Sequence, residues 1–234
     1  MTSLRLSGFH RRIRLHPYPD RIVAGLEDNL HFFATELSHA AGRIDGIRVK
    51  AERYPWNICP GAATFLSDQL AGRQIEAIAN LDMSQHCTHL FELAVLSAAH
   101  AGDERPVQFD LHVDDWAGDC TKVSLFVDGQ PDLECAVRCG EVEGAGQWSW
   151  RNEIAPADRE KAMLVARAVY VSLGRAAPVV DRAVERGPRV LGVCYSYQRS
   201  RVEDAAKMSH SRREFDSEDR GPLADFDPVT VFAD

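Results

Sequence analysis

The sequence is poor in the features that mark membrane, secreted and nucleotide-binding proteins. No apolar run reaches the ~18 residues that a membrane-spanning helix needs, and the opening stretch MTSLRLSGFHRR lacks the apolar core of a secretory signal. No strand-like segment is followed by G-x-G-x-x-G or G-x-x-x-x-G-K, the glycine-rich loops that cradle phosphates. We therefore expect a cytoplasmic protein that has no nucleotide cofactor and no contact with a membrane.

Positive charge is also scarce. The chain has 27 Lys and Arg residues against 35 Asp and Glu residues, which gives a formal net charge of -8. Its one basic stretch, HRRIRLH at residues 10–16, alternates arginine with isoleucine and leucine, as a two-faced strand does. Because binding of a phosphate backbone needs a basic face, we expect no nucleic-acid partner.

The cysteines are not spaced like the ligands of a structural zinc site. None of the six forms a C-x-x-C pair, and the closest two, Cys135 and Cys139, have no second pair nearby. In a cytoplasmic protein these thiols should be reduced. The sequence therefore predicts no structural metal.

What the sequence does contain is a regular order of strand and helix patterns. Period-two alternation is typical of strands, and apolar residues at helical spacing are typical of helices. Gly42 and the pair Asp128-Gly129 suit tight hairpin turns. The order predicts an α+β fold with helices on one face of an antiparallel sheet, in a single domain at residues 1–200 followed by a charged tail at 201–234. Strands are expected at 11–18, 20–28, 30–54 (a hairpin), 106–115, 121–143 (a hairpin) and 192–201, and helices at 60–72, 85–101 and 155–174.

The stretch QHCTHLFEL gathers polar groups at the start of the strongest predicted helix. If the helix begins at Gln85, then Gln85, His89 and Glu92 share one edge, and Glu92 can orient the His89 imidazole as a general base. The alternative is a polar first turn in which His89 is a core residue with its hydrogen bonds satisfied. Both interpretations stay open at the level of sequence.

A rigid bend, YPWNICPG, precedes the first predicted helix and carries Trp56 and Cys59. It could bring Cys59 towards Cys87 and His89, which are three possible zinc ligands. A fourth ligand is not evident, and buried thiols commonly serve as small apolar side chains. We therefore expect no metal here, and we place Trp56 and Cys59 among the substrate-binding residues.

Near the end of the predicted domain, the segment GVCYSYQRSR places Tyr195 and Tyr197 on the same face if it is a strand. Two phenols at this spacing make an aromatic wall with hydroxyl tips, which suits an aromatic ligand. A strand whose tyrosines straddle core and solvent explains the pattern equally well.

Two further segments supply candidate substrate-binding residues. FDLHVDD puts Asp110 and His112 on one strand face, although a solvated sheet face also explains them, and QWSWRNE sets Trp148 beside Arg151.

These motifs together resemble the bacterial family described as domain of unknown function 2889. Its hallmark is a proline-and-cysteine bend after a strand meander, followed by a Cys-Thr-His-Leu-x-Glu-Leu helix start. The later segments ADREKAMLVARAVYVSLGR and GVCYSYQ also look like the longer members, so the resemblance covers most of the chain. One departure is His86, where the family usually has glycine. The matching positions are Pro55, Cys59, Cys87, Thr88, His89, Leu90, Glu92 and Leu93.

The resemblance implies a shared site around the Cys-Thr-His-Leu helix and a loose association with bacteria that degrade aromatic compounds. We therefore expect a cofactor-independent enzyme, a lyase that cleaves a carbon–carbon bond of a phenolic intermediate such as a lignin-derived dimer. His89 would take a proton while Tyr195 or Tyr197 binds the phenol. The alternatives are a ligand-binding or accessory protein without turnover, and a zinc- or thiol-dependent hydrolase that uses Cys59, Cys87 and His89. The expected partner is an aromatic small molecule, and a homodimer is left open.

Overall fold

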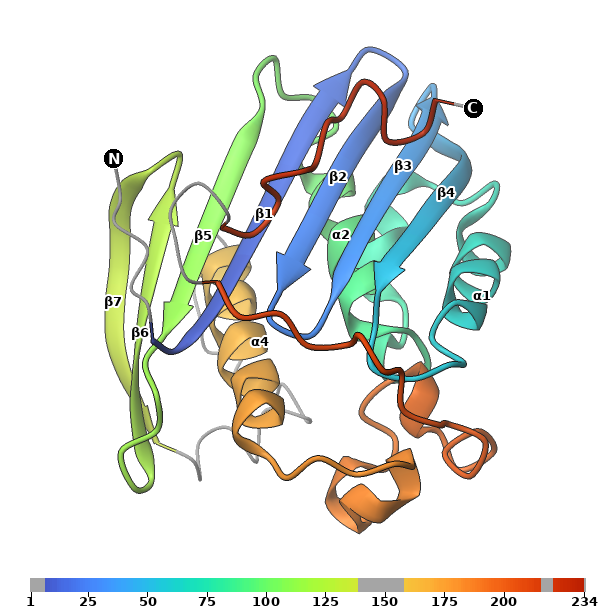
Figure 1. The fold of residues 1–234 in the computed structure, drawn as a ribbon. Coiled ribbons are helices and arrows are strands. Elements are labelled where there is room, and N and C mark those ends of the chain that lie inside the picture. The colour runs from blue at the N-terminus through green and yellow to red at the C-terminus, as the bar shows by residue number, and fades with distance from the viewer. Residues whose placement is uncertain (1–6, 139–157, 216–220, 234) are drawn as a thin grey trace.

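The computed structural model describes residues 7–138, 158–215 and 221–233, which form an antiparallel seven-stranded sheet with helices on one face (Figure 1). The strand order is β4-β3-β2-β1-β5-β6-β7, so β1 lies in the centre of the sheet. The predicted α+β class is confirmed. The strands are β1 (Phe9–Tyr18), β2 (Arg21–Asp28), β3 (Phe32–Ala40), β4 (Arg43–Arg53), β5 (Val107–Val113), β6 (Cys120–Val127) and β7 (Gln130–Arg138). The α-helices are α1 (Gly61–Leu70), α2 (Thr88–Ala99) and α4 (Arg159–Ala176).

Two hairpin turns form where the sequence predicts them. Ala41 and Gly42 between β3 and β4 both have positive φ, at 49° and 75°, and Asp128 and Gly129 between β6 and β7 have 50° and 77°. Two successive residues with positive φ characterise the type I′ turn, whose twist matches that of the strands it joins. Local chemistry therefore sets the ends of both hairpins.

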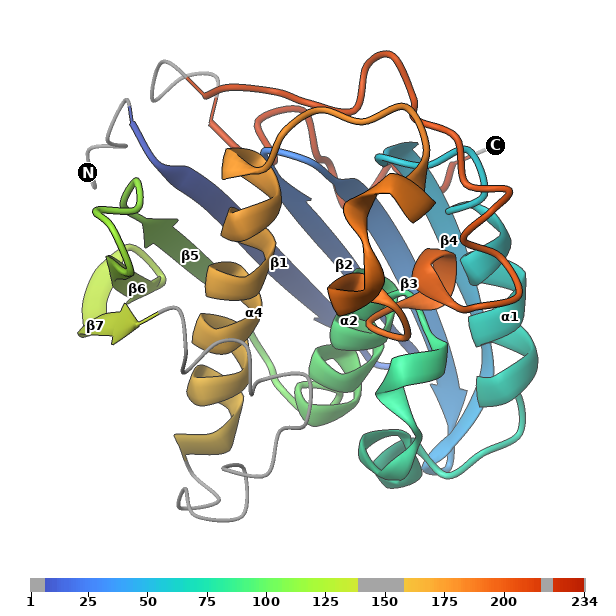
Figure 2. The ribbon, with the colours of Figure 1, turned by 90° about the horizontal axis from the view of Figure 1, so that it is seen from below.

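Helices α1, α2 and α4 cover one face of the sheet (Figure 2). Helix α2 lies against β1, β2 and β3, while α1 lies against β4, and α4 against β1, β5 and β6. The apolar stripe Leu90, Leu93 and Leu96 of α2 is no more than 1% exposed, as the amphipathic pattern predicts. Among the described residues, no helix combines the length and the apolar character needed to cross a membrane.

The C-terminal tail crosses the opposite face of the sheet (Figure 1). Leu223 and Phe226 are buried there against Val23 and Ala34. A Cβ built on Gly25 would lie 2.9 Å from the Phe226 ring, so the glycine allows the close approach of the ring. Residues 221–233 of the charged tail therefore pack against the second face of the sheet.

Several predicted boundaries differ from the structure for local reasons. Helix α2 begins at Thr88 rather than Gln85, because Met83–Gln85 forms a separate 3-10 turn. Helix α4 continues past Gly174, whose missing side chain gives room to Leu30. The strand expected at residues 192–201 is wrong, since Tyr195–Tyr197 is a 3-10 turn. Further 3-10 segments among the described residues are Ile75–Asn80, Ala183–Arg186 and Pro188–Val190.

Candidate functional site

The candidate site lies at the end of β2, where the turn into β3 meets the start of α2. Asp28 ends β2, and its Oδ1 accepts hydrogen bonds from the backbone N–H groups of Leu30 (2.8 Å) and His31 (2.9 Å). Aspartate closes turns in this way because its short side chain reaches the backbone two residues on. The turn therefore fixes the Asp28 carboxylate and brings His31 back beside it.

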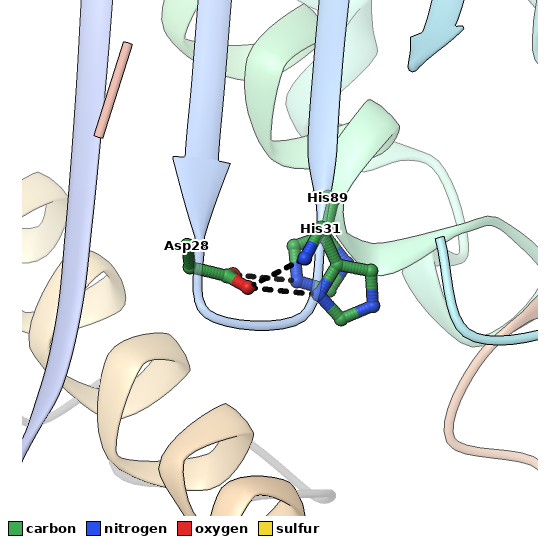
Figure 3. Close-up of side chains that lie close together, drawn as sticks. All are labelled: Asp28, His31 and His89. Carbon is green, nitrogen blue, oxygen red and sulfur yellow. Dashed lines mark hydrogen bonds and ion pairs between the residues drawn. The ribbon is translucent and has the colours of Figure 1, made fainter. Parts of the chain in front are cut away.

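His89, from the first turn of α2, completes a three-residue cluster with Asp28 and His31 (Figure 3). His89 Nε2 lies 3.4 Å from Asp28 Oδ2, and His31 Nδ1 lies 3.1 Å from Asp28 Oδ1. The two imidazole rings stack with their centroids 3.7 Å apart and an interplanar angle of 29°. Both imidazoles therefore turn a nitrogen towards the same carboxylate.

The cluster is buried, and some of its polar atoms have no hydrogen-bond partner. Asp28, His89 and His31 are 0%, 4% and 9% exposed. Within the described part of the chain, Asp28 Oδ2 and His89 Nε2 have no hydrogen-bond partner. Such atoms are rare in folded proteins and often mark a functional site or an unseen ion.

An ion pair lies behind the carboxylate. Arg11 Nη2 is 2.8 Å from Glu92 Oε2, and Arg11 Nε is 3.9 Å from Asp28 Oδ2, with all three side chains at most 1% exposed. Glu92 therefore pairs with Arg11, which corrects the expectation that it orients His89. Gln85, expected on the same helix edge, lies in the separate 3-10 turn and belongs to no such edge.

The electrostatics of the cluster follow from burial and from the neighbouring charges. Burial would raise the pKa of Asp28, but the imidazoles of His31 and His89 hold that pKa well below its usual value. Burial, and next to it the charge of His31, hold the pKa of His89 well below its usual value. Burial raises the pKa of Glu92, against the opposing charge of Arg11. At neutral pH the cluster therefore presents an ionised carboxylate beside a neutral imidazole of His89.

The structure does not assemble the thiol site that the sequence offered. Cys59 Sγ lies 3.3 Å from Ser196 Oγ, and Cys59 packs with Trp56 in a separate small apolar cluster. Burial raises the pKa of Cys59, and it raises the pKa of Cys87 to about 12, so neither is a ready thiolate. Among the described residues, the side chains that could bind a metal ion together with His89 are those of Asp28 and His31, not the thiols of Cys59 and Cys87.

The two candidate tyrosines make their contacts with residues other than His89. The backbone N–H of Tyr195 donates to the carbonyl of His86 (2.9 Å), and the Tyr195 ring lies 4.1 Å from the Arg201 guanidinium. The Tyr197 ring meets Trp56 edge-on, and burial raises the pKa of Tyr197. The phenol of Tyr197 therefore lies beside the bend that carries Trp56, while the Tyr195 hydroxyl lies against Gly61 at the start of α1.

Alternate side chains of a strand point to opposite faces of the sheet. Asp110 and His112 belong to the set of β5 side chains that points away from the helices. Asp110 Oδ1 pairs with Arg12 Nε at 2.5 Å, and His112 Nε2 lies 2.9 Å from Asp114 Oδ1. The sheet therefore separates this pair from His89. Trp148 and Arg151 lie outside the described residues.

Sequence reasoning missed Arg11, Asp28 and His31. Arg11 does leave a signal, because it interrupts the apolar series Phe9, Ile13 and Leu15 on one strand face, and a charge in that series must find a buried partner. Asp28 and His31 read as ordinary turn residues.

No family model, no curated protein and no solved structure matches this chain. The resemblance to the domain of unknown function 2889 stays a prediction.

Proposed function

We propose that the chain is a small-molecule enzyme whose reaction centre is Asp28, His31 and His89, with the Arg11–Glu92 ion pair behind it. The observation that carries this proposal is the pair of buried atoms, Asp28 Oδ2 and His89 Nε2, that form an ion-pair contact at 3.4 Å but no well-aligned hydrogen bond. A buried polar atom without a partner costs about 1–3 kcal/mol. A protein that holds two of them side by side sacrifices stability, which is typical of a site kept for a ligand or a reaction.

The reaction class that we propose is carbon–carbon bond cleavage in a phenolic substrate. A phenol with a benzylic hydroxyl group can lose water to form a quinone methide. The quinone methide accepts the electron pair of a neighbouring side-chain carbon–carbon bond as that bond breaks, which restores the phenol, leaves a conjugated product and releases an aldehyde. The protein then has to supply little besides groups that move protons and polarise oxygen. A carboxylate and two imidazoles are such groups. Phe33 lies 6.0 Å from His31 and 6.1 Å from His89 between ring centroids, which gives the centre an aromatic neighbour. The resemblance to a family associated with aromatic catabolism supports the same class of substrate.

A second candidate function is ligand binding without turnover. It is favoured by the burial of all three side chains, since a reaction centre needs a path for substrate and His31, the most exposed of them, is only 9% exposed. The two functions share a site and differ in whether product appears.

A panel of phenolic lignin-type dimers separates these functions. The purified protein should release a small aldehyde or a newly conjugated phenol, followed by liquid chromatography and by absorbance. Asp28→Asn should lower turnover by about 10²–10⁴-fold, the usual contribution of a positioned acid–base group. The matched control is Asp114→Asn, which removes a carboxylate on the other side of the sheet, and it should stay within a few-fold of wild type.

Each outcome of this experiment decides between the candidates. Saturable binding of a dimer without any product favours the ligand-binding function. Turnover that survives Asp28→Asn in a folded protein contradicts the proposed centre.

A further inference from the structure

We infer that Asp28, His31 and His89 form a binding site for one divalent transition-metal ion. Their ligand atoms all lie within 4.8 Å of one another and come from the end of β2, the β2–β3 turn and the start of α2 (Figure 3). The inference goes beyond the proposed function, because a metal can bind here whether or not the chain is a lyase.

The distances in the cluster are compatible with ligands of a common ion. Zinc binds nitrogen and oxygen at about 2.0–2.2 Å, which places neighbouring ligand atoms about 2.8–3.1 Å apart in octahedral geometry and about 3.3–3.6 Å apart in tetrahedral geometry. His31 Nδ1 lies 3.1 Å from Asp28 Oδ1, within hydrogen-bond distance, and His89 Nε2 lies 3.4 Å from Asp28 Oδ2. Each imidazole nitrogen therefore lies next to one oxygen of the same carboxylate, at a separation that a shared ion can bridge.

The second ring nitrogen of His89 has a partner that fits the same function. Thr88 Oγ1 lies 3.4 Å from His89 Nδ1, on the side of the ring away from Asp28. Metal-binding histidines commonly donate their other N–H to an oxygen, which fixes the tautomer and leaves the ligand nitrogen free. Here the free nitrogen is Nε2, the buried atom without a hydrogen-bond partner.

The carboxylate is also held in place by groups that do not bind the metal. Asp28 Oδ1 accepts hydrogen bonds from two backbone N–H groups of the turn and also lies 3.1 Å from His31 Nδ1, while Oδ2 accepts no hydrogen bond. The nearby positive charge of Arg11 opposes a cation, but Glu92 at 2.8 Å offsets that charge. The ligand set therefore keeps the negative charge of Asp28 available to a cation.

The donor set indicates the class of metal. Two imidazoles and one carboxylate suit zinc, iron(II), manganese, cobalt or nickel, whereas calcium and magnesium prefer oxygen alone and copper(I) prefers sulfur. Three protein ligands leave at least one position open for water or a substrate oxygen. With the ion in place, both imidazoles are ligands, and a bound substrate would be polarised at the open position.

Metal analysis and titration test the inference directly. Protein from medium supplemented with zinc, iron, manganese, cobalt and nickel, purified without chelator, should contain about one equivalent of metal by mass spectrometry. After chelator treatment, Co²⁺ titration should give visible d–d absorption that saturates at one equivalent, and Zn²⁺ should abolish it by competition.

Three variants assign the ligands. His31→Gln changes the most exposed of the three side chains, so it is the least prone to unfold, and it should weaken Co²⁺ binding at least tenfold with the circular dichroism unchanged. His16→Gln, on the opposite sheet face beside Phe226, is the matched control and should bind as wild type does. Cys87→Ser should also bind as wild type does, because the thiol is not a ligand.

The inference is overturned if wild-type protein is purified metal-free and also fails to bind millimolar Co²⁺ or Zn²⁺. It is also overturned if folded His31→Gln binds Co²⁺ as tightly as wild type. Stoichiometric metal without turnover of any dimer supports the metal site and counts against the lyase. Turnover by a chain that binds no metal supports the lyase and overturns the metal site.

Discussion

Glu92→Gln tests whether the Arg11–Glu92 ion pair holds the interior together. The substitution keeps the shape of the side chain and removes the negative charge 2.8 Å from Arg11 Nη2. The Arg11 side chain is fully buried, and among the described residues its next negative neighbour is Asp28 Oδ2, 3.9 Å from Arg11 Nε. The variant therefore leaves the buried Arg11 guanidinium with one neighbouring carboxylate instead of two.

The expected cost follows from the distance and the burial. Two unit charges 2.8 Å apart attract by about 6 kcal/mol at an effective dielectric constant of ~20. The amide oxygen of the new glutamine remains a dipole beside the Arg11 guanidinium, which offsets part of this loss. Loss of one partner from a buried ion pair usually costs about 3–5 kcal/mol, so we expect the free energy of unfolding to fall by that amount.

Urea unfolding followed by tryptophan fluorescence measures this change. The control is Glu52→Gln, which removes one partner of the exposed Lys50–Glu52 pair and should cost less than about 1 kcal/mol. The double variant Arg11→Met/Glu92→Leu should recover most of the lost stability, because well-packed apolar side chains often replace a buried ion pair without loss. If the free energy of unfolding of Glu92→Gln lies within about 1 kcal/mol of the wild-type value, the reasoning is refuted.

Three further predictions concern packing and pH. Leu93→Ala should lower the free energy of unfolding by about 2–5 kcal/mol in a denaturant titration, because Leu93 is fully buried between α2 and the sheet; a loss near zero would contradict the packing. The pKa of His100 is raised to about 9, first by its hydrogen bond to Glu160 of α4, so its contribution to stability is complete below the unfolded pKa and is lost as pH rises through about 9. The difference in free energy of unfolding between wild type and His100→Gln should therefore shrink by about 1–3 kcal/mol from pH 6 to pH 10, allowing for partial screening. A difference that does not change with pH would contradict this role of His100. Gly25→Ala places a Cβ 2.9 Å from the Phe226 ring and should cost about 1–3 kcal/mol in thermal or chemical unfolding; the double variant with Phe226→Leu should recover part of that loss if the contact is its cause.

The sequence alone determined the strands of the sheet and the three predicted helices, apart from their exact ends, because their signals are local. The period-two alternation of Ile47, Val49 and Ala51 predicts a strand, and that segment is the second half of β4. Gly42 and Asp128-Gly129 predict turns because few other residues tolerate positive φ. The leucines of α2 repeat at helical spacing, so their burial against a sheet could be predicted without knowing which strands they would meet.

The candidate site depended on the tertiary structure, because its members lie far apart in the sequence and none of them is distinctive alone. The sequence named His89 but paired it with Glu92, its neighbour one helical turn away. The strand order sets β1 and β2 side by side beneath α2. As a result, Glu92 of α2 pairs with Arg11 of β1, and His89 of α2 pairs with Asp28 of β2. A strand also sends alternate residues to opposite faces. Arg11 and Asp28 lie on the sheet face that the helices cover, and this brings them to His89. Asp110 and His112 lie on the opposite face, under the C-terminal tail.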